Sequence, residues 1–162
     1  MMELDFTAIA AKLGKVLLEK QLMLGTAESC TGGLVAGAIT AIAGSSEWFE
    51  RGFVTYSNRA KQEMLGVSAE TLEREGAVSA AVVTEMAAGV LKMAPVQVAV
   101  AVSGIAGPSG GSASKPVGMV YFAWAVPGQP IVTACRHFQG DRERVRVEAV
   151  RFVLGELVQK LG

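Results

Sequence analysis

A cluster of hydroxyl side chains and two glycines stands where a short apolar run, residues 22–27, meets a helical pattern that begins at Leu34. The cluster reads Glu28-Ser29-Cys30-Thr31-Gly32-Gly33. A strand-to-helix junction leaves backbone N–H groups without partners, and the helix dipole adds positive potential. The pattern therefore predicts a place for a phosphate or a developing oxyanion, with Ser29 either contacting a ligand or attacking it.

An attacking serine needs a base that accepts its proton. His137 is the only histidine and lies in a predicted strand, which argues against a Ser-His-Asp triad. Lys61 is the remaining candidate: with Asn58 as N-cap of a helix over 58–65, it is the third helical residue, where the dipole and partial burial both lower a lysine pKa. The alternative is a solvated surface lysine. Tyr56, expected at the end of the preceding strand, relays a proton, orients Lys61 or simply packs on the core.

Further hydroxyls, glycines and an arginine are candidates for holding a ligand. Arg142 and Arg146 are four residues apart at the start of a predicted helix and so share a face that suits an anion. The alternative is that residues 141–146 form a solvated charged face. Thr31 either touches the ligand or caps the helix, and Glu28 and Lys115 receive no firm role. The candidate substrate-binding residues are Thr31, Gly32, Gly33, Ser45, Ser103, Gly104, Gly107 and Arg142.

Hydrophobic periodicity predicts the elements that must position these residues. Helices are expected over 6–17, 34–42, 58–65, 68–75, 80–93 and 142–161, with the first 14 residues forming an amphipathic pattern; strands are expected over 22–27, 49–56, 96–102, 117–126 and 130–138. Residues 103–116 form a long loop of the kind that tends to be functional. The order predicts one domain over 1–162: an α/β fold, a three-layer α/β/α sandwich with a mixed, mostly parallel sheet.

Composition narrows the class of protein. Apolar residues make up 51 % of the chain, which excludes disorder, and 15 basic residues balance 15 acidic ones, which argues against nucleic acid as a partner. No apolar run reaches membrane-spanning length, and the N-terminus does not look like a signal peptide. Cys30 and Cys135 have no metal-binding spacing. We expect a cytoplasmic protein without metal or cofactor, and its apolar content favours a homodimer or higher homo-oligomer.

Four motifs in register carry a resemblance to a known family: residues 27–33 (AESCTGG), 54–61 (VTYSNRAK), 103–108 (SGIAGP) with 115–118 (KPVG), and 138–142 (FQGDR). Together they resemble the CinA C-terminal domain family over nearly the whole chain, in its stand-alone form. Ser103, Met119 and Arg51 depart from the family pattern, although Ser103 keeps a hydroxyl. Members are nicotinamide mononucleotide deamidases, which convert the carboxamide to a carboxylate and release ammonia in pyridine nucleotide recycling.

The resemblance implies that nicotinamide mononucleotide is the small-molecule partner and that Ser29, Lys61 and Tyr56 carry the reaction. Two other classes of function remain open. The same helix N-terminus and glycine-rich loop suit a nucleotide- or phosphate-binding module without catalysis, and a third possibility is a packing or interaction domain. Ammonia release from nicotinamide mononucleotide separates the enzyme from both alternatives.

Overall fold

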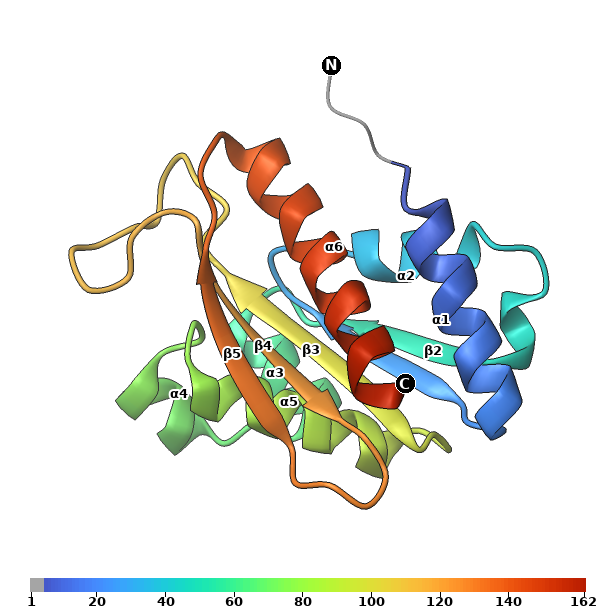
Figure 1. Ribbon diagram of the computed structural model, residues 1–162. Helices are drawn as coiled ribbons and strands as arrows, with labels where there is room; N and C mark the ends of the chain where they lie inside the picture. The colour runs from blue at the N-terminus through green and yellow to red at the C-terminus, as the bar shows by residue number, and fades with distance from the viewer. Residues whose placement is uncertain (1–4) are drawn as a thin grey trace.

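Five strands form one mixed sheet in the order β2-β1-β3-β4-β5 (Figure 1). In this computed structural model, which describes residues 5–162, β1 and its neighbours β2 and β3 run parallel, whereas β4 is antiparallel to both β3 and β5. The predicted mixed, mostly parallel sheet is confirmed. The strands are β1 Leu24–Glu28, β2 Phe49–Val54, β3 Val98–Gly104, β4 Met119–Ala125 and β5 Val132–His137.

Helices cover both faces of the sheet and complete the three predicted layers (Figure 1). One face carries α1 (Thr7–Lys20), α2 (Leu34–Thr40) and α6 (Arg142–Leu161); the other carries α3 (Asn58–Leu65), α4 (Ala69–Glu75) and α5 (Ala80–Met93). A short 3-10 helix, η1 (Ser45–Glu47), precedes β2. The part of the expected N-terminal amphipathic pattern over residues 1–4 lies outside the described residues.

Alternation along the central strand sorts the core into two clusters. Val98, Val100 and Val102 pack under α1, α2 and α6, while Ala99 and Ala101 face the α5 layer. Small side chains on that second face let α5 lie close to the sheet. The branched side chains fill the wider space beneath the long α6 helix.

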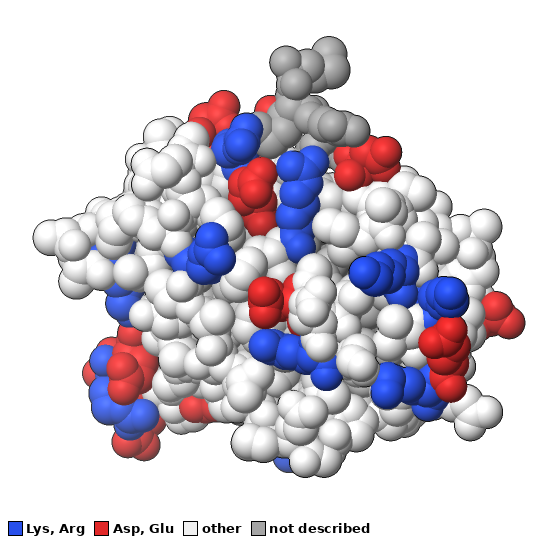
Figure 2. Space-filling model, viewed as in Figure 1, with Lys and Arg blue, Asp and Glu red and all other residues white. Residues whose placement is uncertain are grey.

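The surface carries charges of both signs. Figure 2 shows basic and acidic side chains interspersed over the face that includes α1 and α6. Among residues 5–162, no helix combines the length and the apolar character that crossing a bilayer requires.

Three local predictions next to the site are wrong. Strand β3 continues to Gly104, so Ser103 and Gly104 belong to the strand and not to the loop predicted over 103–116. Strand β2 ends at Val54, so Tyr56 lies in the connection to α3 rather than at the strand end. Ser57, not Asn58, caps α3: its extended backbone lets Oγ accept from the Ala60 N–H at 3.0 Å. Both residue types cap well, but Ser57 precedes the first helical residue and Asn58 is already helical. Lys61 is therefore the fourth helical residue, one position later than expected.

The register explains where a site forms. Glu28 at the end of β1 pairs with Val54 at the end of β2 and with Val102 of β3, so these three parallel strands end within two residues of one another. The segments that follow them meet at one edge of the sheet, which is where open α/β sheets bind ligands.

Candidate active site

Lys61 is buried although its side chain carries an amine. It is 1 % exposed, and its Nζ donates to the Thr55 carbonyl at 2.8 Å and to the Tyr56 carbonyl at 3.3 Å. None of the ion pairs among residues 5–162 involves it. Burial lowers the pKa of Lys61 from 10.5 to about 8, because desolvation penalises the ammonium form. The alternative of a solvated surface lysine is wrong.

Ser29 completes the surroundings of this amine. Its Oγ lies 3.0 Å from Lys61 Nζ and 3.4 Å from the Tyr56 carbonyl oxygen. The two carbonyls can only accept hydrogen bonds, so they take the two N–H groups of a neutral amine. In the ammonium form, Nζ also donates to Ser29 Oγ. In the neutral form, its lone pair can face the one neighbour that can donate, the Ser29 hydroxyl. This arrangement suits proton transfer from serine to lysine.

Tyr56 contributes to this centre through its backbone. Its carbonyl oxygen contacts both Lys61 and Ser29, whereas its phenol Oη accepts from Arg142 Nη2 at 3.0 Å. The side chain is 61 % exposed. The geometry therefore gives no support to a proton relay through the phenol.

The N-terminus of helix α2 binds a side chain of the protein itself. The Glu28 carboxylate accepts from the N–H groups of Gly33, Val35 and Ala36 at 2.9–3.2 Å and from Thr31 Oγ1 at 2.6 Å. These are the donors that were expected to hold a phosphate or an oxyanion. That expectation is wrong for the helix N–H groups, because a buried carboxylate takes the place of the ligand.

A cavity of about 340 Å³ opens beside Ser29 and Lys61. Of the predicted site residues, Tyr56, Ser103, Gly104, Gly107 and Arg142 line it together with that pair. The structure does not bring Thr31, Gly32, Gly33 or Ser45 to the cavity. Thr31 and Gly33 bind Glu28 instead, and Ser45 lies in η1 before β2, at the opposite edge of the sheet.

The sequence did not predict one wall of the cavity. Ala77 and Val78, in the connection between α4 and α5, line it without polar side chains. The Ser103 hydroxyl donates to the Ala77 carbonyl at 2.9 Å, so Ser103 ties this wall to β3. Apolar lining residues of this kind carry no spacing that marks them in a sequence. Asn58 also lines the cavity, since Ser57 and not Asn58 caps α3.

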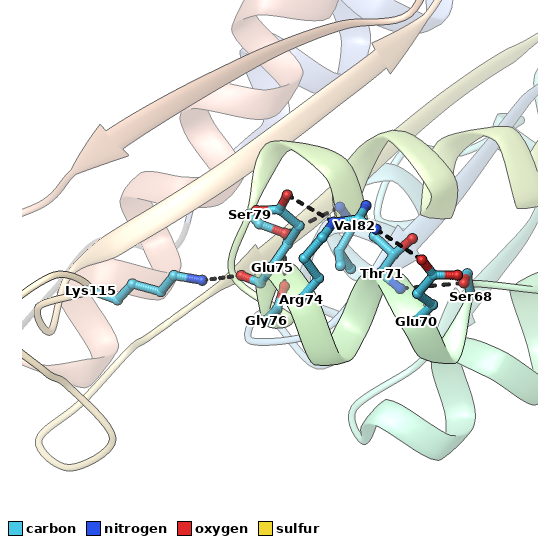
Figure 3. A network of polar contacts seen from close by, with 9 residues as sticks. All are labelled: Ser68, Glu70, Thr71, Arg74, Glu75, Gly76, Ser79, Val82 and Lys115. Atoms are coloured by element: carbon cyan, nitrogen blue, oxygen red, sulfur yellow. Dashed lines mark hydrogen bonds and ion pairs between the residues drawn. The ribbon is translucent and has the colours of Figure 1, made fainter.

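The same wall is braced from the loop before β4. Figure 3 shows Lys115 reaching to the carbonyl of Glu75 at the end of α4, next to Gly76. Gly76 has a φ of +77°, and a Cβ there would lie 2.8 Å from Lys115 Nζ. Lys115 therefore contacts the outside of the wall and is not among the residues that line the cavity.

Arg142 lies at the cavity mouth. Its Nη1 donates to the Gly107 carbonyl at 2.8 Å, and its Nη2 donates to the Tyr56 phenol, so the guanidinium links the loops after β2 and β3. Two of its five N–H donors are used in this way, which leaves others for an anion. Arg146 contacts the carbonyls of Cys30 and Thr31 instead of the cavity.

Cys30, the residue after Ser29, does not present a thiolate. Burial, with the nearby Glu28 carboxylate, raises the pKa of the Cys30 thiol to about 11, which keeps it protonated. Within residues 5–162, no group of three or more His, Cys, Asp or Glu side chains is arranged to hold a metal ion.

The fold and the site describe an α/β/α sandwich with a serine–lysine pair at the carboxyl edge of its sheet. A family model for the CinA C-terminal domain matches residues 6–161, and the chain belongs to this family. The predicted resemblance is confirmed.

Two relatives and one solved structure illustrate the similarity. Nicotinamide-nucleotide amidohydrolase PncC from Enterobacter agglomerans is 59 % identical over 146 residues, covering 90 % of this chain and 89 % of that protein. The protein of the same name from Escherichia coli strain K12 is 51 % identical over 160 residues, covering 99 % and 97 %. The crystal structure of competence damage-inducible protein A from Klebsiella pneumoniae has a TM-score of 0.92 at 44 % identity and covers 96 % of each chain.

Proposed function

We propose that this protein hydrolyses the carboxamide of nicotinamide mononucleotide to give nicotinate mononucleotide and ammonia, with Ser29 as the nucleophile and Lys61 as its base. The names of the two relatives support the substrate. The observation that carries the mechanism is the 3.0 Å contact between the Ser29 hydroxyl and a buried amine that pairs with no carboxylate among residues 5–162.

The first half-reaction forms an acyl-enzyme. Neutral Lys61 takes the Ser29 proton while Oγ bonds to the carboxamide carbon. The tetrahedral intermediate then expels its nitrogen as the Lys61 ammonium returns the proton, so ammonia leaves and an ester on Ser29 remains. In the second half, Lys61 takes a proton from water, the resulting hydroxide attacks the ester, and the proton returns to Oγ as the carboxylic acid is released, which then loses its proton to solvent.

An oxyanion donor is needed next to the nucleophile. The Gly32 N–H donates to the Ser29 carbonyl and the Gly33 N–H to Glu28, so neither is available. The Cys30 N–H has no backbone acceptor among the described residues, and Cys30 lines the cavity. We therefore assign Cys30 N–H as the first candidate for this role.

The lowered pKa makes this base workable near neutral pH. At a pKa of about 8, roughly one amine in ten is neutral at pH 7, against a few in ten thousand for an unperturbed lysine. Arg142 also lines the cavity, and we assign its remaining N–H donors to the phosphate of the nucleotide.

The test is ammonia release from nicotinamide mononucleotide by the parent protein and by Ser29→Ala and Lys61→Met. We expect turnover to fall by roughly three orders of magnitude or more in both variants, while calorimetry still detects nucleotide binding. Ser46→Ala and Lys92→Met, at exposed positions away from the cavity, are the matched controls. Full turnover by Ser29→Ala would exclude the nucleophile. Binding without any turnover by the parent would favour the alternative, a non-catalytic nucleotide-binding module.

The biological setting follows from the proposed substrate. We propose a role in cytoplasmic pyridine nucleotide recycling, and the expected homodimer or higher homo-oligomer stays a prediction that light scattering of the purified protein can test.

A further inference from the structure

Arg146, in the second turn of α6, holds the peptide segment that follows the nucleophile. Its Nε donates to the Cys30 carbonyl and its Nη2 to the Thr31 carbonyl, both at 3.1 Å. We propose that Arg146 is a positioning residue that fixes Ser29 against Lys61 without touching the substrate. This inference rests on the proposed function, because it assigns a role in the reaction of the same site.

A short path of rigid units connects the guanidinium to Ser29. The peptide plane that contains the Thr31 carbonyl also contains the Gly32 N–H, which points the opposite way. That N–H donates to the Ser29 carbonyl at 3.0 Å. Fixing the Thr31 carbonyl therefore fixes the orientation of the donor that holds Ser29. At the other end of the same residue, the Ser29 N–H donates to the Val102 carbonyl in the neighbouring strand β3 at 3.0 Å.

The segment needs such a restraint because of its backbone. Gly32 and Gly33 have φ values of +56° and +105°, conformations that glycine adopts freely and that allow several alternative turns. A Cβ at Gly32 would lie 3.4 Å from Arg146 Nη2, so the guanidinium lies directly against the turn. The restraint comes from α6, more than a hundred residues further along the chain.

Glu28 and Arg146 bind complementary groups of this segment. The Glu28 carboxylate takes N–H groups and the Thr31 hydroxyl, whereas Arg146 takes two carbonyls. None of the ion pairs among the described residues joins the two, so each charge is directed at the segment. Fixing the Cys30 carbonyl also fixes the peptide that follows it, next to the candidate oxyanion donor.

The two bonds require the shape of an arginine. A guanidinium presents its N–H groups in a planar fork, so it can bind two carbonyls at once. The single ammonium of a lysine at this position can replace one bond but not the pair of fixed directions. We therefore expect Arg146→Lys and Arg146→Gln to lower kcat by roughly ten- to a hundredfold, with little change in KM. Arg146 does not line the cavity, which is why KM should stay.

The experiment compares Arg146→Lys and Arg146→Gln with Arg142→Lys and with Arg144→Lys, an exposed change on the same helix. For each protein we would measure kcat, KM, Tm and the rate at which a fluorophosphonate labels Ser29, followed by intact mass. The expected pattern is a loss of kcat and of labelling rate in the Arg146 variants, a raised KM in Arg142→Lys, and parent values in Arg144→Lys. A further variant, Arg146→Ala, leaves room for a small cation, and added methylguanidinium should restore part of its labelling rate.

Two results would overturn the inference. The first is kcat and labelling within about twofold of the parent in Arg146→Gln. The second is a loss that follows the fall in Tm across the variants and that methylguanidinium leaves unchanged, since that pattern marks a residue needed only for folding. If the parent is labelled at Ser29 but releases no ammonia, the proposed function fails, and the labelling rates alone decide the role of Arg146.

Discussion

The buried Lys61 amine should lower the free energy of unfolding relative to a variant that lacks this amine. Below a pH of about 8 the amine is protonated in both the folded and the unfolded chain, and the folded state carries the full desolvation cost. Between the folded value and the unfolded value of 10.5 the folded chain binds fewer protons, so stability rises with pH. The ionisation of Lys61 therefore lowers the free energy of unfolding most at neutral pH and below, and this effect disappears above the unfolded pKa of 10.5.

The lowered pKa fixes the size of this effect. A change from 10.5 to about 8 corresponds to roughly 3 kcal/mol of lost unfolding free energy at neutral pH, at about 1.4 kcal/mol for each factor of ten in proton affinity. Lys61→Met removes this cost, but it leaves the Thr55 carbonyl without its donor and the Tyr56 carbonyl with only the Ser29 hydroxyl, which costs about 1–3 kcal/mol. That second cost does not depend on pH, so the pH dependence separates the two.

The assay is urea unfolding of the parent and of Lys61→Met at several pH values, with Lys92→Met as the exposed control. We expect the difference in unfolding free energy to move by roughly 2–3 kcal/mol in favour of the parent between about pH 7 and pH 10. The control difference should stay constant. A Lys61→Met difference that is flat over this range, or that moves the other way, would show that the amine is not desolvated and would remove the basis for its action as a base.

Three further predictions concern the reaction and the packing. The N-ribosylated ring of the proposed substrate is positively charged, so bound substrate should lower the pKa of Lys61 further. The pH profile of kcat, which reports Lys61 in the complex, should therefore rise at lower pH than the profile of kcat/KM, which reports the free enzyme. Profiles that rise at the same pH would contradict this prediction. Tyr56→Phe removes the bond to Arg142 and should raise KM by up to about tenfold while kcat changes little, whereas a collapse of kcat would restore the phenol as a proton relay. Gly89→Ala should lower Tm by several degrees in a thermal melt, since its Cβ would lie 2.2 Å from the Leu65 carbonyl oxygen in α3.

The convergence of the site could be predicted because it follows from strand direction alone. Ser29 comes after β1, Lys61 belongs to the helix after β2, and Ser103 and Gly104 end β3. Carboxyl ends of parallel strands meet at one edge, so these residues had to approach one another. The same rule excludes Ser45, which precedes β2 and therefore lies at the other edge. Its hydroxyl suggested a ligand contact, but its place in the chain argued against one.

Other features could not be predicted because they depend on where side chains point. The sequence offered two arginines on one face of α6, and only the packing of that helix directs Arg142 to the cavity mouth and Arg146 to the turn after Ser29. The apolar wall at Ala77 and Val78 has no chemical signature. Its position depends on contacts from Ser103 and Lys115, which are far from it in the sequence.

The alternation of neighbouring residues at the end of β1 explains how a carboxylate and an amine of lowered pKa lie near one serine without pairing. Successive side chains of a strand point to opposite faces. Glu28 points to the α2 side, where helix N–H groups bind it, and the next residue, Ser29, meets Lys61 from the α3 side. A shift of one residue would exchange these directions and place the carboxylate beside the amine. Lys61 would then gain a counterion, its pKa would rise, and it would stay protonated at the pH where the proposed reaction needs its lone pair. The strand register that orders the sheet is thus also what keeps the pKa of the base low.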